Sequence, residues 1–146
     1  MPRFLLPLGE FAACLGEAGE VTQGLAIVDD ALVRCETRDE GWYLAELRRI
    51  KGELILKGGG SEAAAQAEEE FLSAIDLARR QGALSWELRT AASLARLLRD
   101  QGHSADAMAV LQPVYDRFTE GFATADLKAA KALLDDLSEL EKFATA

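Results

Sequence analysis

The chain has 146 residues, of which 49% are hydrophobic and 7% aromatic, and its formal net charge at pH 7 is −9. This negative charge argues against nucleic acid or an anionic membrane surface as a direct partner, and no apolar run is long enough to cross a bilayer. Abundant alanine and leucine with only three prolines predict an all-α fold in a single domain, residues 1–146, and not a disordered chain.

Residues 4–36 are predicted to form a first antiparallel helix pair with a turn at Gly19. Apolar residues at helical spacing predict the inward face of the first helix, which comprises Leu8, Phe11, Ala12 and Leu15. Gly24 stands where the returning helix of such a pair usually has alanine, and it therefore predicts a very close crossing of the two helices.

The first residues of the chain do not read as a signal peptide, because Pro7 and Glu10 interrupt the apolar run. Cys14 and Cys35 lie in the two helices of the first pair. Two cysteines suit buried, reduced thiols better than a disulfide framework, and a redox pair is the alternative interpretation. We expect a cytoplasmic protein.

Residues 38–81 are predicted to form the second helix pair. Thr37 and Glu40 have the spacing of a capping box that opens its first helix, and Trp42 follows as a packing anchor. The three glycines 58–60 end that helix, and Ser61 is predicted to cap the next one. The best match to a repeat pattern lies in this second helix, at Ala67, Phe71 and Ala74. The glycine loop leaves the register of the first helix ambiguous by about one turn.

Residues 83–119 carry the clearest helix pair. The spacing Ala91-x2-Leu94-Ala95-x2-Leu98, then Gly102 at the turn, then Ala107-x3-Leu111-x2-Val114 follows the tetratricopeptide pattern, with aliphatic residues at the aromatic positions. Ser104 is predicted to cap the second helix of this pair.

Residues 124–141 are predicted to form a C-terminal capping helix that Thr124 opens. The whole chain is therefore expected to be a tetratricopeptide-like array of three antiparallel helix pairs plus this helix, curved into a right-handed superhelix. The N-terminal end has no equivalent cap. Its apolar residues predict a surface for homodimerisation, formed by Phe4, Leu5, Leu6 and Leu8.

Three runs of sequence resemble one bacterial family: WYLAELRRIKGELIL, FLSAIDLARRQGALSWELRTAASLARLLRDQG and LQPVYDRFTEGFATADLKAAKALLDDL. They are similar to the C-terminal repeat region of large signalling proteins. In that family a predicted ATPase module and a tetratricopeptide-like tail follow a class III adenylate or guanylate cyclase domain, or a winged-helix DNA-binding domain. The resemblance covers about residues 8–140 and implies a regulatory or scaffolding tail. The family's enzymatic residues lie in domains outside this sequence.

The residues themselves predict no catalytic, metal or cofactor site. The lone His103 lies in a predicted turn without convergent ligands, and it is expected to be solvent-exposed. The run of three glutamates, 68–70, diverges around a helix and is expected to be a solvated face. Trp86, near the start of a helix, is expected to be a packing anchor like Trp42.

One pattern of charge predicts a binding surface. The first helices of the second and third pairs are rich in lysine and arginine, whereas the helix within 61–81 is acidic. In tetratricopeptide arrays the first helices line the concave face, so a basic groove for an acidic peptide or a C-terminal carboxylate is one interpretation. Its candidate residues are Arg48, Arg49, Lys51, Arg89, Arg96 and Arg99.

The alternative interpretation of these charges is pairing within helices at a spacing of four. It predicts the pairs Arg49–Glu53, Glu53–Lys57, Asp76–Arg80 and Arg96–Asp100.

Three functions are compatible with the sequence. The first is a non-catalytic protein-interaction or regulatory module, whose partner is a protein, an acidic peptide or the adjoining domains of a signalling ATPase or cyclase. The second is a homo-oligomerisation element that assembles through the N-terminal end. The third is a helical domain that senses a small molecule in a pocket between helices.

Overall fold

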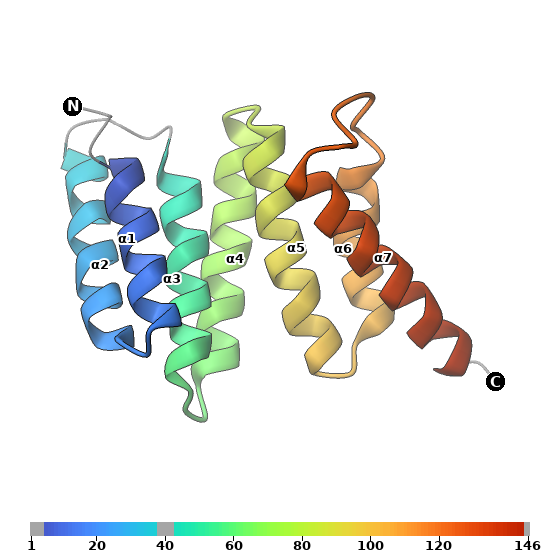
Figure 1. The fold of residues 1–146 in the computed structure, drawn as a ribbon, viewed down its shortest axis with the longest axis horizontal. Coiled ribbons are helices and arrows are strands. Elements are labelled where there is room, and N and C mark those ends of the chain that lie inside the picture. Colours follow the sequence, from blue (N-terminus) through green and yellow to red (C-terminus); the bar gives the residue numbers. More distant parts are fainter. Residues whose placement is uncertain (1–4, 38–42, 145–146) are drawn as a thin grey trace. The chain divides into compact units, whose positions relative to one another are not determined.

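A computed structural model describes residues 5–37 and 43–144 of the chain, with side chains for residues 9–35 and 43–143. The described residues contain helices and turns and no strand, which confirms the all-α prediction (Figure 1). They fall into two compact units, Met1–Gln81 and Gly82–Ala146. The prediction of a single repeat domain stays a prediction.

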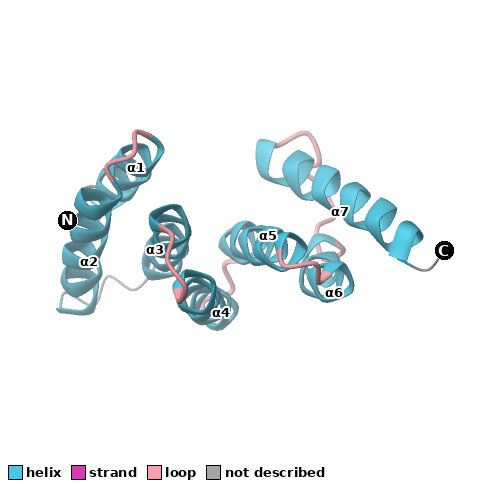
Figure 2. Ribbon diagram, turned by 90° about the horizontal axis from the view of Figure 1, so that it is seen from below, coloured by secondary structure: helices cyan, strands magenta, loops and turns pink. Residues whose placement is uncertain are grey.

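The first unit contains four helices: α1 (Leu5–Glu17), α2 (Val21–Thr37), α3 (Leu44–Gly58) and α4 (Ala63–Arg80). Helix α1 packs against both α2 and α3, and α3 packs in turn against α2 and α4 (Figure 2). Each helix thus contacts the next one along the chain, and α1 also contacts the helix after that.

Glycine and alanine set the close spacing of α1, α2 and α3. A Cβ atom on Gly24 of α2 would lie 2.9 Å from the carbonyl oxygen of Ala12 on α1, which confirms the predicted close crossing. Gly9 and Gly16 present the same side of α1 to α3, where the side chains of Leu47 and Leu54 fill the space that a Cβ would need. The inward stripe of α1 is therefore made of small residues, and leucines of α3 pack into it.

Phe11 does not face inward as predicted. Its side chain is 54% exposed, whereas the neighbouring Ala12 is fully buried. The backbones of α1 and α2 approach too closely at Ala12 to leave room for an aromatic ring, so Phe11 lies on the outer side of α1. Cys14, three residues further on the same helix, is exposed, and Cys35 on α2 is buried. The prediction of two buried thiols is therefore wrong for Cys14, and no disulfide joins the two cysteines.

The turn from α3 to α4 contains Gly59 and Gly60, which have φ angles of +72° and +106° that favour glycine. A Cβ atom on Gly52 of α3 would lie 2.5 Å from the ring of Phe71 on α4, so Phe71 packs directly on the backbone of α3. This contact fixes the register that the sequence left ambiguous.

The second unit contains three helices: α5 (Leu84–Asp100), α6 (Ser104–Tyr115) and α7 (Ala125–Ala144). Helix α5 packs against both α6 and α7, and α6 packs against α7. Gly102 has a φ angle of +82° in the α5–α6 turn, as its predicted role requires. The core of this unit includes Leu94, Ala95, Ala107, Leu111 and Leu134.

The predicted side-chain caps are not present. Helix α4 begins at Ala63 after Glu62, and α6 begins at Ser104 itself; neither helix has a side-chain cap hydrogen bond, so the capping roles of Ser61 and Ser104 are wrong. Thr37 is the last residue of α2 and not the first of a later helix. Its predicted partner Glu40, like Trp42, lies outside the described residues. Thr124 directly precedes α7, as expected.

Candidate functional site

The basic residues of α3 lie beside carboxylates of the same unit. Arg48 donates a hydrogen bond from Nη1 to Oε2 of Glu70 on α4, at 3.1 Å. Lys51 lies 2.9 Å from Asp29 on α2 and 3.7 Å from Glu70. These ion pairs connect α3 to its neighbours α2 and α4. They also neutralise positive charges that were predicted to line a basic groove.

Arg49 forms a bidentate pair with Glu46, one turn earlier on α3. Nε donates to one carboxylate oxygen at 2.9 Å and Nη2 to the other at 2.6 Å, and Glu46 is 2% exposed. Burial of the guanidinium acts to lower the pKa of Arg49, but the hydrogen bond and charge of Glu46, with the charge of Glu53, outweigh burial and raise it. Arg49 therefore stays charged, with Glu46 as its counter-ion.

In the second unit, two arginines of α5 pair with two aspartates of α7. Arg89 donates from Nε to Oδ2 of Asp126 at 3.0 Å, and Arg99 donates from Nη1 to Oδ2 of Asp136 at 3.2 Å. Each pair joins residues 37 positions apart in the sequence. The two helices consequently run in parallel with one constant register.

Both arginines also make contacts within α5 itself. The guanidinium of Arg89 also lies over the ring of Trp86, 5.7 Å from its centre, which places Trp86 as a partly buried packing residue. Arg99 also reaches Asp100 at 3.2 Å.

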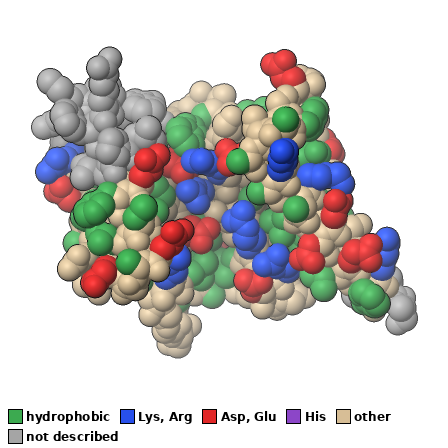
Figure 3. Space-filling view, viewed as in Figure 1, with side chains coloured by type: hydrophobic (Ala, Val, Ile, Leu, Met, Phe, Trp, Pro, Cys, Tyr) green, Lys and Arg blue, Asp and Glu red, His purple; other side chains and the backbone are tan. Residues whose placement is uncertain are grey.

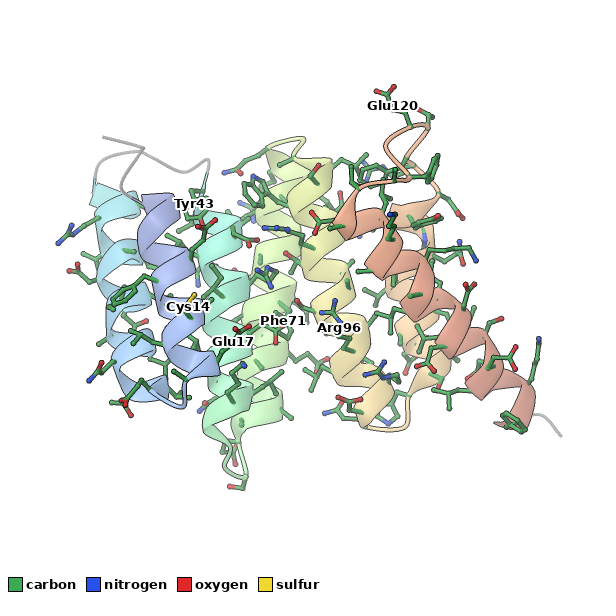
Figure 4. All side chains as sticks on the ribbon, viewed as in Figure 1. Cys14, Glu17, Tyr43, Phe71, Arg96 and Glu120 are labelled. Carbon is green, nitrogen blue, oxygen red and sulfur yellow. The ribbon has the colours of Figure 1, made fainter. Side chains whose placement is uncertain are left out.

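Arg96 differs from the other five candidates. It projects from α5 into solvent (Figure 4), and no carboxylate among the described residues lies within 4.0 Å of it. The predicted pair of Arg96 with Asp100 does not form. The pair Asp76–Arg80, which the same spacing rule predicted, does form on α4.

The six basic candidates therefore do not act as one uncompensated patch. Within each unit, lysine and arginine side chains lie among aspartate and glutamate side chains on the face viewed in Figure 3. The sequence also gave no sign of the pair between Arg117, just after α6, and the buried Glu87 on α5, at 2.8 Å. The two residues of this pair are 30 positions apart in the sequence.

The predicted self-association surface is only partly visible. Phe4 lies outside the described residues. Leu5, Leu6 and Leu8 lie on α1, and their side chains are not among those that the structure describes. Phe11 is the exposed apolar side chain that α1 does present among its described residues.

A cavity of about 320 Å³ lies between α1 and α3. Its apolar part is formed by Ala13, Ile50 and Leu54, and its charged part by Glu17, Arg49, Glu53 and Lys57. Glu17 lies in the last turn of α1 (Figure 4). The i, i+4 pairs that the sequence predicted for Glu53 with Arg49 and with Lys57 are not formed.

The remaining candidates behave mostly as expected. His103 is exposed in the turn before α6. Glu69 is exposed, but Glu70 is half-buried against Arg48 and Lys51, so the prediction of a solvated glutamate face is wrong for Glu70. Among residues 5–37 and 43–144, no three histidine, cysteine, aspartate or glutamate side chains are grouped so that they could hold a metal ion.

Comparison with known proteins gives no relative. No family model, curated protein or solved structure matches the chain. Within the part of the chain that the structure describes, no helix is both long enough and apolar enough to span a membrane.

Proposed function

We propose that this chain is a non-catalytic protein-interaction module, built from tetratricopeptide-like helix pairs. The observation that carries the proposal is a shared packing rule in the two units. In each unit the first helix contacts the second helix and then the third, so that the first and third helices lie side by side.

The spacing of these contacts supports the proposal. On α1 and α3, Gly9 meets Leu47 and Gly16 meets Leu54, a separation of 38 residues at both points. On α5 and α7 the separation is 37 residues at both ion pairs. These separations lie between the period of tetratricopeptide repeats, ~34 residues, and that of HEAT-type repeats, ~40–47 residues. Stacked helix pairs of this type present rigid surfaces to partner proteins.

The resemblance of the sequence supports a regulatory context for this module. We assign the chain to the C-terminal scaffold or sensor region of a signalling ATPase or nucleotide cyclase, acting in the cytoplasm of a bacterium. Binding of a partner to the module would then bias the activity of the domains attached to it.

Fewer basic residues are available to an acidic partner than the sequence predicted. Arg96 is the candidate cation that keeps its charge available, because Arg48, Arg49, Lys51, Arg89 and Arg99 lie in ion pairs. An acidic partner segment would therefore contact α5 at Arg96. Of the other five cations, Arg89 and Arg99 link α5 to α7. The remaining three lie in the first unit, where they pair with carboxylates of α2, α3 and α4.

Affinity capture tests this proposal. The immobilised wild-type chain is compared with Arg96→Glu, and with Lys128→Glu as a control that reverses an exposed charge on α7. We expect a retained protein whose recovery falls about tenfold with Arg96→Glu and is unchanged with Lys128→Glu, since a charge-assisted hydrogen bond contributes about 1.5 kcal/mol or more. Equal recovery with all three chains would exclude Arg96 from the interface.

Phe11 favours a second candidate function, self-association through α1. The side chain of Phe11 is 54% exposed, and a contact between two copies at α1 would remove this ring from water. We expect the wild-type chain to be a dimer by light scattering after size exclusion and Phe11→Glu to be a monomer, whereas Leu72→Glu, at an equally exposed site on α4, leaves the dimer intact. A wild-type monomer at every concentration would rule this function out.

A further inference from the structure

The cavity between α1 and α3 combines an apolar floor with charged walls. Ala13 of α1 and Ile50 and Leu54 of α3 form the floor. Its volume of about 320 Å³ is at the lower end of the range of about 300–1,000 Å³ that small-molecule sites occupy. The space therefore suits a compact ligand with one apolar body.

The charges around the cavity are unequally compensated. Glu17 and Glu53 line it, and neither forms an ion pair within 4.0 Å of a lysine or arginine that the structure describes. Arg49 also lines it, but its Nε and Nη2 already donate to the two carboxylate oxygens of the buried Glu46. Glu46 does not itself line the cavity, but with this counter-ion of Arg49 included three carboxylates accompany two cations.

Lys57 is the remaining cation. It lies on α3 beside the cavity, and the aliphatic part of its side chain packs near Gly16 of α1. Lys57 is an exposed residue, and its ammonium group forms no ion pair with a carboxylate among the described residues. With Arg49 neutralised by Glu46, the cavity has an excess of negative charge. Glu17 and Glu53, from different helices, flank its apolar floor without an ion pair within 4.0 Å, although Glu53 also interacts with the charge of Arg49.

We propose that this cavity binds an organic ammonium ion, whose charged group lies between Glu17 and Glu53 and whose apolar body covers Ile50 and Leu54. The two carboxylates accept hydrogen bonds from the ammonium group, and such charge-assisted bonds are strong where water is partly excluded. The apolar body gains from leaving water. This binding site does not depend on the proposed protein-interaction function.

Two sources can supply this chemistry: a free amine, or the N-terminal ammonium of a peptide that begins with an apolar residue. Matched probes separate them. Tryptamine represents the free amine, and the peptide Trp-Ala-Ala-amide represents the peptide terminus. Indole-3-propionate has the same ring and chain length as tryptamine but the opposite charge. Tryptophol is the neutral counterpart of tryptamine, with a hydroxyl group in place of the ammonium group.

Binding is measured by titration of each probe into the full ¹⁵N-labelled chain, with chemical shifts followed along α1 and α3. We expect tryptamine to shift the resonances around Glu17 and Glu53 in a saturable manner. Tryptophol should bind at least about tenfold more weakly, and indole-3-propionate should not bind. Tighter binding of the peptide than of tryptamine identifies a peptide terminus as the ligand, and tighter binding of tryptamine identifies a free amine.

Charge variants provide the decisive control. Glu17→Gln and Glu53→Gln should each weaken tryptamine binding about tenfold. Lys57→Met should strengthen it about threefold, because a like charge is removed at close range. Glu10→Gln, which changes an exposed carboxylate on α1 outside the cavity, should have no effect.

Some results would overturn the proposal. These are tryptamine binding no more tightly than tryptophol, tighter binding of indole-3-propionate, weaker binding with Lys57→Met, or the absence of saturable shifts at millimolar tryptamine. Ala13→Leu, which fills the cavity without changing its charge, should abolish binding while the helical circular dichroism is retained. Binding that survives this variant would place the amine elsewhere.

Discussion

Gly24 shows how a single residue sets the distance between two helices. Replacement of a mid-helix glycine by alanine usually stabilises a helix by up to about 1 kcal/mol. At Gly24 the new methyl group would lie 2.9 Å from the backbone oxygen of Ala12, which cannot move without moving α1. We therefore expect Gly24→Ala to lower the free energy of unfolding by about 1–3 kcal/mol, as measured by urea denaturation.

Gly58 provides the matched control for this prediction. A Cβ atom there would approach only a methyl group of Val21, at 3.3 Å, and a side chain can yield where a backbone cannot. Gly58→Ala should therefore change the free energy of unfolding by less than about 0.5 kcal/mol. If Gly24→Ala were as stable as Gly58→Ala, the close crossing of α1 and α2 would be wrong.

At the same scale, Phe11 shows where prediction from the sequence failed. The helical spacing of apolar residues placed Phe11 inward beside Ala12. The stripe that packs is instead small, because Gly9, Ala12 and Gly16 allow neighbouring helices to approach their backbone. Gly24 was predicted correctly for the same physical reason. Large apolar residues thus gave a misleading signal in α1, and small residues gave the informative one.

Helices α5 and α7 offer a test at the scale of elements. Arg89 and Asp126 are 40% and 41% exposed, so solvent weakens their ion pair and we expect it to contribute only about 0.2–1 kcal/mol. In a double-mutant cycle, Arg89→Asp and Asp126→Arg should each destabilise the fold. The double variant should recover part of that loss, because the two charges are opposite again.

The control for this cycle exchanges Asp126 for Asp136, the residue of the second ion pair. Ten residues of helix extend about 15 Å, which is too far for a direct contact with Arg89. Arg89→Asp combined with Asp136→Arg should therefore show additive effects on the free energy of unfolding. Coupling in this pair and none in the first would contradict the register of α5 against α7.

Glycine turns could be predicted from the sequence, whereas helix caps and ion pairs between helices could not. Gly19 and Gly102 marked turns correctly, because a positive φ angle is a local requirement that glycine meets. Ser61 and Ser104 were wrongly expected to cap helices, since a capping residue one position from the true start has no role. The pairs of Arg89 and Arg99 could not be predicted, because their partners are 37 residues away and depend on packing.

At the scale of the whole molecule, the sequence established the class of fold but little about its surface. Small and aliphatic residues at helical spacing indicated helix pairs, and the described residues are all-α. The prediction of a basic groove rested on counting the charges of each helix separately. Once helices pack, Glu70, Asp29 and Asp126 lie against those cations, so net charge per helix does not measure the charge that a partner meets.

The cavity between α1 and α3 was beyond prediction for a related reason. Its residues come from positions 13–17 and 49–57, and neither segment has a recognised motif. Glu53 was expected to pair with Arg49 and Lys57, four residues away on either side. Glu46 instead holds Arg49, which leaves Glu53 to line the cavity.

The most direct test of the central claim, a non-catalytic module that binds a protein through α5, is amide hydrogen exchange of the chain alone and with its captured partner. We predict slower exchange in peptides that cover residues 90–100, around Arg96, and no such change in the complex prepared with Arg96→Glu. Slower exchange confined to α1 in a chain that only self-associates would contradict the claim and favour the oligomerisation function.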